Sequence, residues 1–332
     1  MTYPRAHIVT PGQPGFYHCI SRCVRQAWLC GREPLSGRDL DYRRAWIEDR
    51  LLELAEIFAV AVFSYAVMSN HYHVIVRVDP HLAERWSDEE IARRWVRLYP
   101  ARRSGKVDEA ATEARYQALL AHPDRLAEVR RRLGSLSWFM RRLNEPIARR
   151  ANREDERQGH FWESRFQCQA LLDEAAVLAA MAYVDLNPQR AGMAPSLIES
   201  DHTAAQRRLK GAEAEPETLK APLAPIAGPA PAGVLPCSTR EYLALAAWTG
   251  EQVHKGNQPK PAGRQPAGPS SVKVLRRVHL NDRQWLWQVQ GIGSRYWRMI
   301  GLLGNLKIKA QELEQRWLKG IGSARRLALM QT

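Results

Sequence analysis

The spacing of apolar residues along the first 80 positions predicts a strand, a helix and a β-hairpin. Residues 15–23 (GFYHCISRC) have the pattern of a strand, and residues 43–58 place apolar side chains at helical spacing. Residues 59–78 (AVAVFSYAVMSNHYHVIVRV) are rich in valine and aromatics, which favours two strands joined by a tight turn at Ser69 and Asn70.

The middle of the chain favours helices. A capping box begins one helix at Ser87, and a polar, arginine-rich helical stretch at about 81–132 has the character of an insertion. A helix with a clear apolar face begins near Ser135, and Pro146 is expected to kink or divide it.

A strand and a capped helix follow. Residues 160–172 (HFWESRFQCQALL) have the composition of a strand, and Asp173 caps the helix DEAAVLAAMAYVDLN, which Pro188 ends. The order of elements predicts an α+β domain with a mostly antiparallel sheet.

The last third of the chain differs in composition. Residues 211–236 are rich in Pro and Ala and predict a linker after a first domain at 1–210. Residues 237–332 predict an accessory, basic, helical DNA-binding region, in which the motif GIGS occurs at 291–294 and at 320–323. Each copy is either a phosphate-binding turn of the helix-hairpin-helix kind or an ordinary glycine helix stop.

Charge and composition narrow the class of partner. The net charge of +14 suggests a polyanion, either nucleic acid or an anionic membrane surface. No apolar run has the length of a membrane span and the first residues have no signal-peptide core, so we expect a cytoplasmic, nucleoid-associated protein without a membrane partner. The five cysteines include no CxxC pair, which favours reduced, buried thiols over a zinc site at Cys19 and Cys23.

Two short sequence patterns contain residues that can bind a metal or act in catalysis. His71 and His73 lie two apart on a predicted strand, so both imidazoles face one side and can share a metal ion. Tyr183 and Asn187 lie four apart on the capped helix, so they point the same way. A phenol beside a carboxamide oxygen suits phosphoryl transfer at a metal, although each pattern alone also fits a structural role.

Together these blocks resemble one family. SNHYHVIV resembles the HUH signature (His, hydrophobe, His) of single-tyrosine transposases, and GHFWESRFQCQALLDE with MAYVDLNPQRAGM resembles the second signature of the REP-associated tyrosine transposases. The opening RAHIVTPGQPGFYHCISR also fits, and the resemblance spans roughly residues 5–200. It implies a ferredoxin-like sheet with packed helices as the HUH nuclease core, Mg²⁺ or Mn²⁺ as cofactor, and hairpin-forming single-stranded DNA as substrate.

The resemblance also implies residue roles. Tyr183 matches the catalytic nucleophile, His71 and His73 match the metal ligands, and Asn187 matches the third ligand. The expected product is a 5′-phosphotyrosine with a free 3′-OH. Relatives include monomers and homodimers, and we expect a monomer here.

Four arginines are candidates for DNA contact outside the catalytic group, because guanidinium groups bind phosphate well. They are Arg22, Arg141, Arg142 and Arg165. His18 and His160 are expected to be structural or DNA-contacting rather than metal ligands.

We therefore predict a metal-dependent DNA-cleaving and rejoining transposase. Two alternatives stay open at this stage, namely a non-catalytic nucleic-acid-binding regulator on the same fold and a phosphoesterase that uses water as nucleophile. The predicted catalytic residues all lie before residue 190, so the sequence gives the tail no part in the chemistry.

Overall fold

The computed structural model describes most of the chain. The described residues are 8–24, 29–32, 37–229, 235–253, 266–294 and 298–330.

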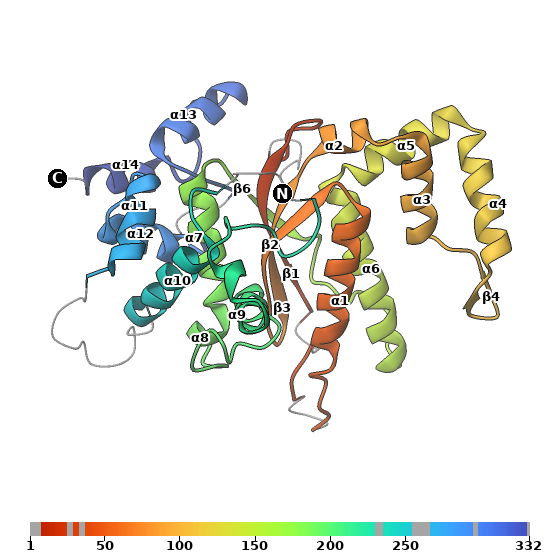
Figure 1. Ribbon diagram of the computed structural model, residues 1–332, viewed down its shortest axis with the longest axis horizontal. Helices are drawn as coiled ribbons and strands as arrows, with labels where there is room; N and C mark the ends of the chain where they lie inside the picture. The colour runs from red at the N-terminus through yellow and green to blue at the C-terminus, as the bar shows by residue number, and fades with distance from the viewer. Residues whose placement is uncertain are drawn as a thin grey trace.

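A five-stranded sheet forms the centre of the molecule (Figure 1). Its strands are β1 (Gly15–Arg22), β2 (Val60–Val67), β3 (His71–Val78), β6 (Gln167–Leu171) and β7 (Met299–Ile300). They lie in the order β2-β3-β1-β6-β7, and every neighbouring pair is antiparallel except β6 and β7, which are parallel. The predicted α+β class with a mostly antiparallel sheet is therefore confirmed. The order of the first four strands is the one that a split βαβ unit of the ferredoxin-like kind produces.

The register of β3 decides which side chains share a face. Strand β1 pairs with β3 from Gly15 opposite Val78 to Arg22 opposite His71, and β2 pairs with the other side of β3. Tyr72 belongs to one hydrophobic core, whereas Ile75 belongs to a second core on the opposite face. His71 and His73 alternate with Tyr72 and so share the face of Ile75.

Helices α1 (Arg43–Ile57) and α6 (Leu136–Glu154) cover the face of Tyr72, to the right of the sheet in Figure 1. The predicted insertion packs outside them as helices and a small hairpin. Its elements are α2 (Pro80–Arg85), α3 (Asp88–Leu98), β4 (Arg102–Arg103), β5 (Lys106–Val107), α4 (Glu109–Leu120) and α5 (Pro123–Leu133). The hairpin was not predicted, because strands of two residues have no readable alternation.

Helix α6 runs unbroken through Pro146, so this proline does not divide the helix, and the kink that was the other expectation stays a prediction. A proline has no N–H group, which leaves the carbonyl of Arg142 without its usual helical partner. The side chain of Arg50 supplies the missing donor, with Nε 3.3 Å from the Arg142 oxygen. A contact from α1 thus replaces the backbone bond.

The predicted strand at 160–172 is also shorter than expected. Strand β6 begins only at Gln167, and the residues before it cross the end of β1 as an isolated bridge between Cys23 and Trp162. The Glu163 amide donates to the Arg22 carbonyl at 2.8 Å, which ties this crossing segment to the end of β1.

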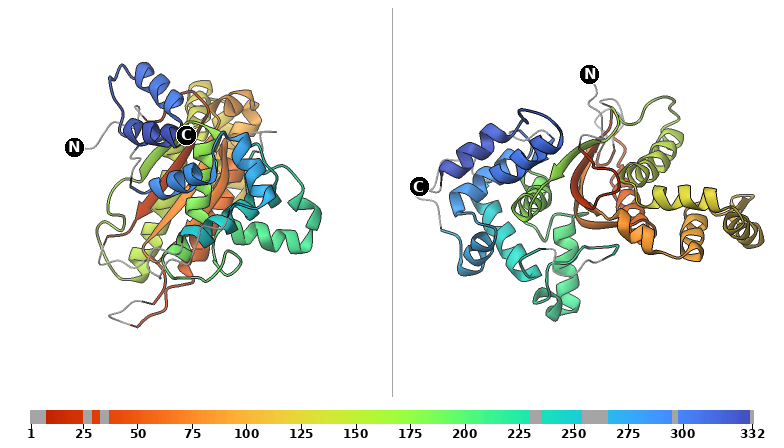
Figure 2. Two further views of the ribbon diagram at one scale, coloured as in Figure 1. Left: turned by 90° about the vertical axis from the view of Figure 1, so that its left-hand side faces the viewer. Right: turned by 90° about the horizontal axis from the view of Figure 1, so that it is seen from above.

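Helix α7 (Glu174–Asp185) covers the opposite face of the sheet, and the C-terminal helices pack around it (Figure 2). The helices that follow it are α8 (Asn187–Arg190), α9 (Ala204–Ala214), η2 (Pro216–Leu219), α10 (Thr239–Val253), α11 (Pro269–Arg277), α12 (Asp282–Gly291), α13 (Leu303–Glu312) and α14 (Ile321–Leu329). Buried residues of α7, α10, α11 and α12 belong to one hydrophobic core.

The C-terminal third is bound into this fold at several points. Strand β7 extends the sheet beside β6, and in the segment 211–236 the Ile226 amide donates to the Val62 carbonyl at 2.7 Å. Gly228 lies so close to β2 that a Cβ there would sit 2.4 Å from the Val60 oxygen. The proposed division into domains stays a prediction, but the C-terminal helices share a core with the sheet.

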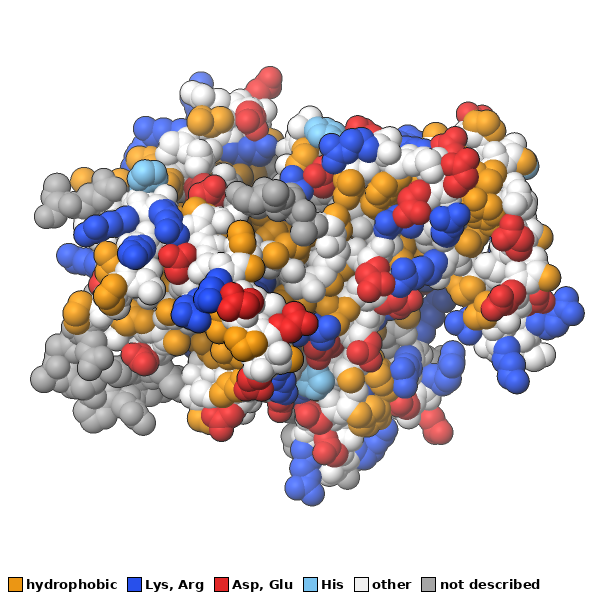
Figure 3. Space-filling model, viewed as in Figure 1, with side chains coloured by type: hydrophobic (Ala, Val, Ile, Leu, Met, Phe, Trp, Pro, Cys, Tyr) orange, Lys and Arg blue, Asp and Glu red, His pale blue; other side chains and the backbone are white. Residues whose placement is uncertain are grey.

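The excess of basic residues does not form a single patch on the face of the molecule shown in Figure 3. Basic and acidic side chains are interspersed over the face shown in Figure 3. No helix in the described part of the chain is both long enough and apolar enough to span a membrane. All five cysteines are buried and none forms a disulfide.

Candidate active site

The hairpin of β2 and β3 positions the two histidines of the HYH motif. The Met68 amide donates to the His71 carbonyl at 2.8 Å and closes the turn. Tyr72 points to the other face, where its hydroxyl donates to Asn144 of α6. His71 is half-buried, His73 is buried, and their ring centroids lie 4.9 Å apart.

Helix α7 brings Tyr183 to these rings. Asp173 caps its first turn by accepting from the Ala176 amide at 2.8 Å, and Tyr183 stands in its last turn. The ring centroid of Tyr183 lies 5.8 Å from that of His73 and 6.1 Å from that of His18. Side chains far apart in sequence thus meet on one face of the sheet.

A buried network holds the end of α7 in place. Asp185, two residues after Tyr183, accepts hydrogen bonds from Ser64 of β2 and from Tyr242 of α10. Burial raises the pKa of Asp185, and the buried Arg208 guanidinium nearby opposes this shift. The network fixes the helix turn that carries Tyr183.

Asn187 begins α8, one turn beyond Tyr183, so the two residues lie in consecutive helices rather than in one. Its Nδ2 atom is buried and has no hydrogen-bond partner among the described residues. A carboxamide can rotate by 180° without changing its shape, which would place Oδ1 in the same position. In that orientation the oxygen would be free to bind a cation.

Burial keeps both histidines neutral, and each ring has one nitrogen within hydrogen-bond distance of a neighbour. Nδ1 of His71 lies 2.7 Å from Oδ1 of Asn70, and Nδ1 of His73 lies 2.9 Å from Nε2 of His18. Burial lowers the pKa of His71 to about 4, with a further contribution from Arg22. Burial, followed by the neighbouring His18, lowers the pKa of His73 well below its ordinary value. Neutral imidazoles have a lone pair for a metal.

His73 has one atom that the protein leaves unsatisfied. Its Nε2 is buried without a hydrogen-bond partner in the described part of the chain. A buried polar atom without a partner costs about 1–3 kcal/mol, so its retention points to a ligand. No cluster of three or more His, Cys, Asp or Glu side chains able to hold a metal occurs among the described residues. A metal at His71 and His73 would therefore need further ligands of another kind.

Two arginines add positive charge to the site. Arg22, predicted as a DNA contact, lies opposite His71 in the sheet register. Arg190 was not predicted, and its Cζ lies 4.7 Å from the centroid of the Tyr183 ring. Arg190 lies in α8, beyond the point at which Pro188 was expected to end the helix, so helical spacing from Tyr183 provided no signal for it.

The other predicted DNA contacts lie elsewhere. Arg141 and Arg142 are on α6, on the far side of the sheet from His73, and both pair with Glu145. Arg165 is exposed in the segment that precedes β6. The structure does not bring α6 arginines to the histidines, and their contact with DNA stays a prediction, as does that of Arg165.

The first GIGS motif contacts the site, which the sequence did not predict. Nε2 of Gln169 in β6 lies 3.3 Å from the carbonyl oxygen of Ile292. A Cβ on Gly293 would sit 2.7 Å from the hydroxyl oxygen of Tyr183. The expectation that the chemistry does not need the tail stays a prediction, but this turn of the tail lies against the tyrosine.

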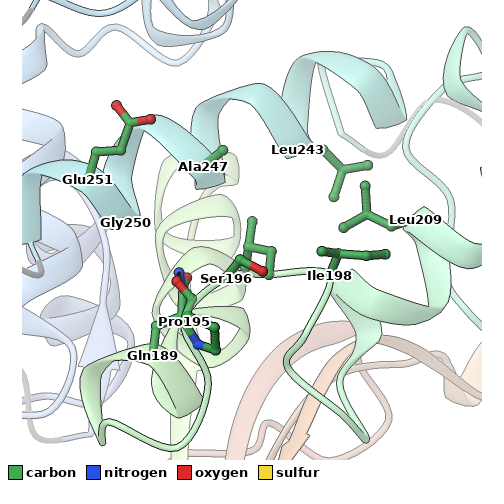
Figure 4. Close-up of a pocket in the computed structure, with 10 residues that line it drawn as sticks. Gln189, Pro195, Ser196, Ile198, Leu209, Leu243, Ala247, Gly250 and Glu251 are labelled. Carbon is green, nitrogen blue, oxygen red and sulfur yellow. Dashed lines mark hydrogen bonds between the residues drawn. The ribbon is translucent and has the colours of Figure 1, made fainter.

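A separate apolar pocket opens beside α8 and α10 (Figure 4). Its volume is about 490 Å³, and its lining includes Leu209, Leu243 and Gly250. None of the histidines or Tyr183 lines it, so we assign it no part in the chemistry.

Comparisons with known proteins give one distant likeness. No protein-family model matches this chain, and no curated protein matches it. A solved structure of a REP-associated tyrosine transposase bound to a REP hairpin is similar, with a TM-score of 0.33 and 10% identity. The match covers 63% of this chain and 86% of that chain. Because the likeness is distant, we infer function from the side chains of the site.

Proposed function

We propose that this protein is a metal-dependent endonuclease and strand transferase that acts on single-stranded, hairpin-forming DNA with Tyr183 as nucleophile. The observation that carries the proposal is the unpartnered, buried Nε2 of His73 beside His71 and Tyr183. The resemblance of the motifs to REP-associated tyrosine transposases supports the choice of substrate.

The donor set fits a divalent metal. Nδ1 of His71 is hydrogen-bonded to Asn70, so its Nε2 is available to bind a metal. Nε2 of His73 is buried without a hydrogen-bond partner in the described part of the chain and can bind the same metal. Asn187 would complete the protein ligands with its carboxamide oxygen. When bound, Mn²⁺ or Mg²⁺ would neutralise a non-bridging phosphate oxygen and make the phosphorus more electrophilic.

Tyr183 would carry out the displacement. Its phenolic oxygen forms a bond to phosphorus, and the bond from phosphorus to the 3′ oxygen breaks. The phenolic proton is lost to water, and the departing 3′ oxygen takes up a proton to become a 3′-OH. Attack by a 3′-OH on the 5′-phosphotyrosine then rejoins the strand, since the covalent link preserves the phosphodiester's energy.

Arg190 and Arg22 would assist through charge. Arg190 lies over the Tyr183 ring and stabilises the negative charge that develops on the phenolic oxygen. Arg22 stands beside His71 at the end of β1, where a guanidinium can hold a DNA phosphate. Both side chains belong to exposed residues, so DNA can reach them.

One chain supplies every group of the proposed site. Tyr183 packs on the sheet that carries His71 and His73 of the same chain. This supports activity in a monomer rather than a need for a homodimer that exchanges the tyrosine helix.

Trapping a covalent adduct tests the proposal. Wild-type protein is incubated with labelled single-stranded hairpins and Mn²⁺ and run on a denaturing gel, with Tyr183→Phe and Tyr116→Phe as matched variants. We expect an adduct for wild type and Tyr116→Phe, and none for Tyr183→Phe. Cleavage without an adduct would indicate a phosphoesterase that uses water, and binding without cleavage would indicate a regulator.

A further inference from the structure

A chain of buried hydrogen bonds leads from the C-terminal turn to His73. The carbonyl oxygen of Ile292 lies 3.3 Å from Nε2 of Gln169, and Oε1 of Gln169 lies 2.8 Å from Nδ1 of His18. Nε2 of His18 then lies 2.9 Å from Nδ1 of His73. The three side chains are each at most 8% exposed, so water does not share these bonds.

The Ile292 carbonyl determines which atom donates and which accepts in each of these hydrogen bonds. A backbone carbonyl can only accept, so the atom of Gln169 that faces Ile292 must be the amide nitrogen. The amide oxygen therefore faces His18 and accepts from its Nδ1–H. A neutral imidazole with hydrogen on Nδ1 has a lone pair on Nε2, and that lone pair accepts from Nδ1–H of His73.

The last step decides what His73 presents to the site. With its hydrogen on Nδ1, His73 has a lone pair on Nε2, the same atom that is buried and unpartnered. The opposite tautomer would place a hydrogen there, and a ring nitrogen that bears hydrogen cannot bind a metal.

We propose that Gln169 and His18, anchored by the Ile292 carbonyl, are positioning residues that fix His73 as the tautomer able to bind the metal. The inference rests on the proposed function, in which His73 is a metal ligand. It assigns the turn at 291–294 a role in the site. Partners that orient a ligating histidine typically contribute about 10- to 100-fold in metal affinity or activity.

The choice of variants separates this role from a packing role. Gln169→Leu keeps a side chain of similar size but removes both polar atoms. Gln169→Glu loses the donor to the Ile292 carbonyl but keeps an oxygen that accepts from Nδ1–H of His18, so it should preserve the tautomer of His73. His18→Phe keeps a ring in place and removes the bond to His73.

Two measurements test the proposal. Long-range ¹H–¹⁵N NMR of histidine-labelled, metal-free protein reports which ring nitrogen of His73 carries hydrogen, with His73→Ala used for assignment. Isothermal titration with Mn²⁺ gives the affinity. We expect hydrogen on Nδ1 in the wild type and in Gln169→Glu, and about 10- to 100-fold weaker Mn²⁺ binding in Gln169→Leu and His18→Phe.

The outcomes separate this inference from the proposed function. Hydrogen on Nε2 of His73 in the wild type, or unchanged Mn²⁺ affinity in both Gln169→Leu and His18→Phe, would overturn the positioning role even if Tyr183 forms its adduct. Because the NMR readout needs neither metal nor DNA, a wild type that forms no adduct would count against the proposed function alone. Similar melting temperatures for Gln169→Leu and Gln169→Glu would show that their contrast is not one of folding.

Discussion

Adding one methyl group at Gly293 should move the nucleophile without harming the fold. Gly293 is exposed, and a Cβ built there would meet the hydroxyl oxygen of Tyr183 at 2.7 Å. Ordinary contacts of a Cβ begin at 3.4 Å. The atom that must yield is the far end of a side chain rather than backbone, so the tyrosine should move by about 0.7 Å and the protein should stay folded.

The size of the effect follows from the geometry of displacement. A misplacement of about 1 Å of a reacting group can cost about 100-fold in rate, because the attacking atom must lie in line with the leaving group. For Gly293→Ala we therefore expect roughly 10- to 100-fold slower adduct formation. The free energy of unfolding should change by less than about 1 kcal/mol, as is usual for exposed positions.

The second GIGS motif provides the matched control. At Gly322, in the first turn of α14, a Cβ would meet nothing within 4 Å. Gly322→Ala should leave adduct formation unchanged and stabilise the helix by about 0.5–1 kcal/mol. Single-turnover adduct formation on hairpin DNA and urea denaturation would measure both variants. Equal rates for Gly293→Ala and wild type would refute the reasoning, since they would mean that the turn yields instead of Tyr183.

Further predictions concern stability at low pH, the stability contribution of the buried Asp185 network and the metal preference of cleavage. Burial lowers the pKa of His18 to about 4, below that of the unfolded chain, so its contribution to stability is complete above about pH 6.5 and is lost as pH falls. Urea denaturation should show a loss of roughly 3 kcal/mol from this residue by pH 4, and His18→Phe should lack that part of the slope. Tyr242→Phe removes a donor to buried Asp185 and should cost about 1–3 kcal/mol in urea, so an unchanged midpoint would contradict the network. Mn²⁺ should support cleavage at lower concentration than Mg²⁺, because Mg²⁺ is a hard cation that prefers oxygen ligands and binds imidazole nitrogen weakly, and equal requirements for the two metals would contradict His71 and His73 as ligands.

The β-hairpin could be read from the sequence because its pattern admits one register. A slip of one residue in β3 would turn Tyr72 and the valines of that face out of their core, so alternation alone places His71 and His73 together. The capped helix could also be predicted from the sequence, since Asp173 caps its start and Pro188 follows its end. These local signals predicted that His71 and His73 share one face of β3 and that Tyr183 stands on a capped helix.

The remainder depends on contacts that no local pattern encodes. Strand β7 has two residues, too few for an alternation to appear. The bond from Gln169 to Ile292 joins positions 123 residues apart, and glycine motifs such as GIGS are equally compatible with a helix stop. The continuity of α6 at Pro146 likewise depends on Arg50 from another helix. Tertiary packing decided each of these outcomes.

The pairing of β7 with β6 has a consequence for the order of synthesis. Tyr183 leaves the ribosome about a hundred residues before Ile292 and the strand that begins at Met299, and His71 and His73 leave it earlier still. Chains fold from the N-terminus as they are made, so a ribosome-bound or prematurely ended chain would contain the nucleophile before its supporting turn exists. Under the proposed function, full cutting activity would then arise only after β7 has been synthesised, and chains that end before it would be poor nucleases.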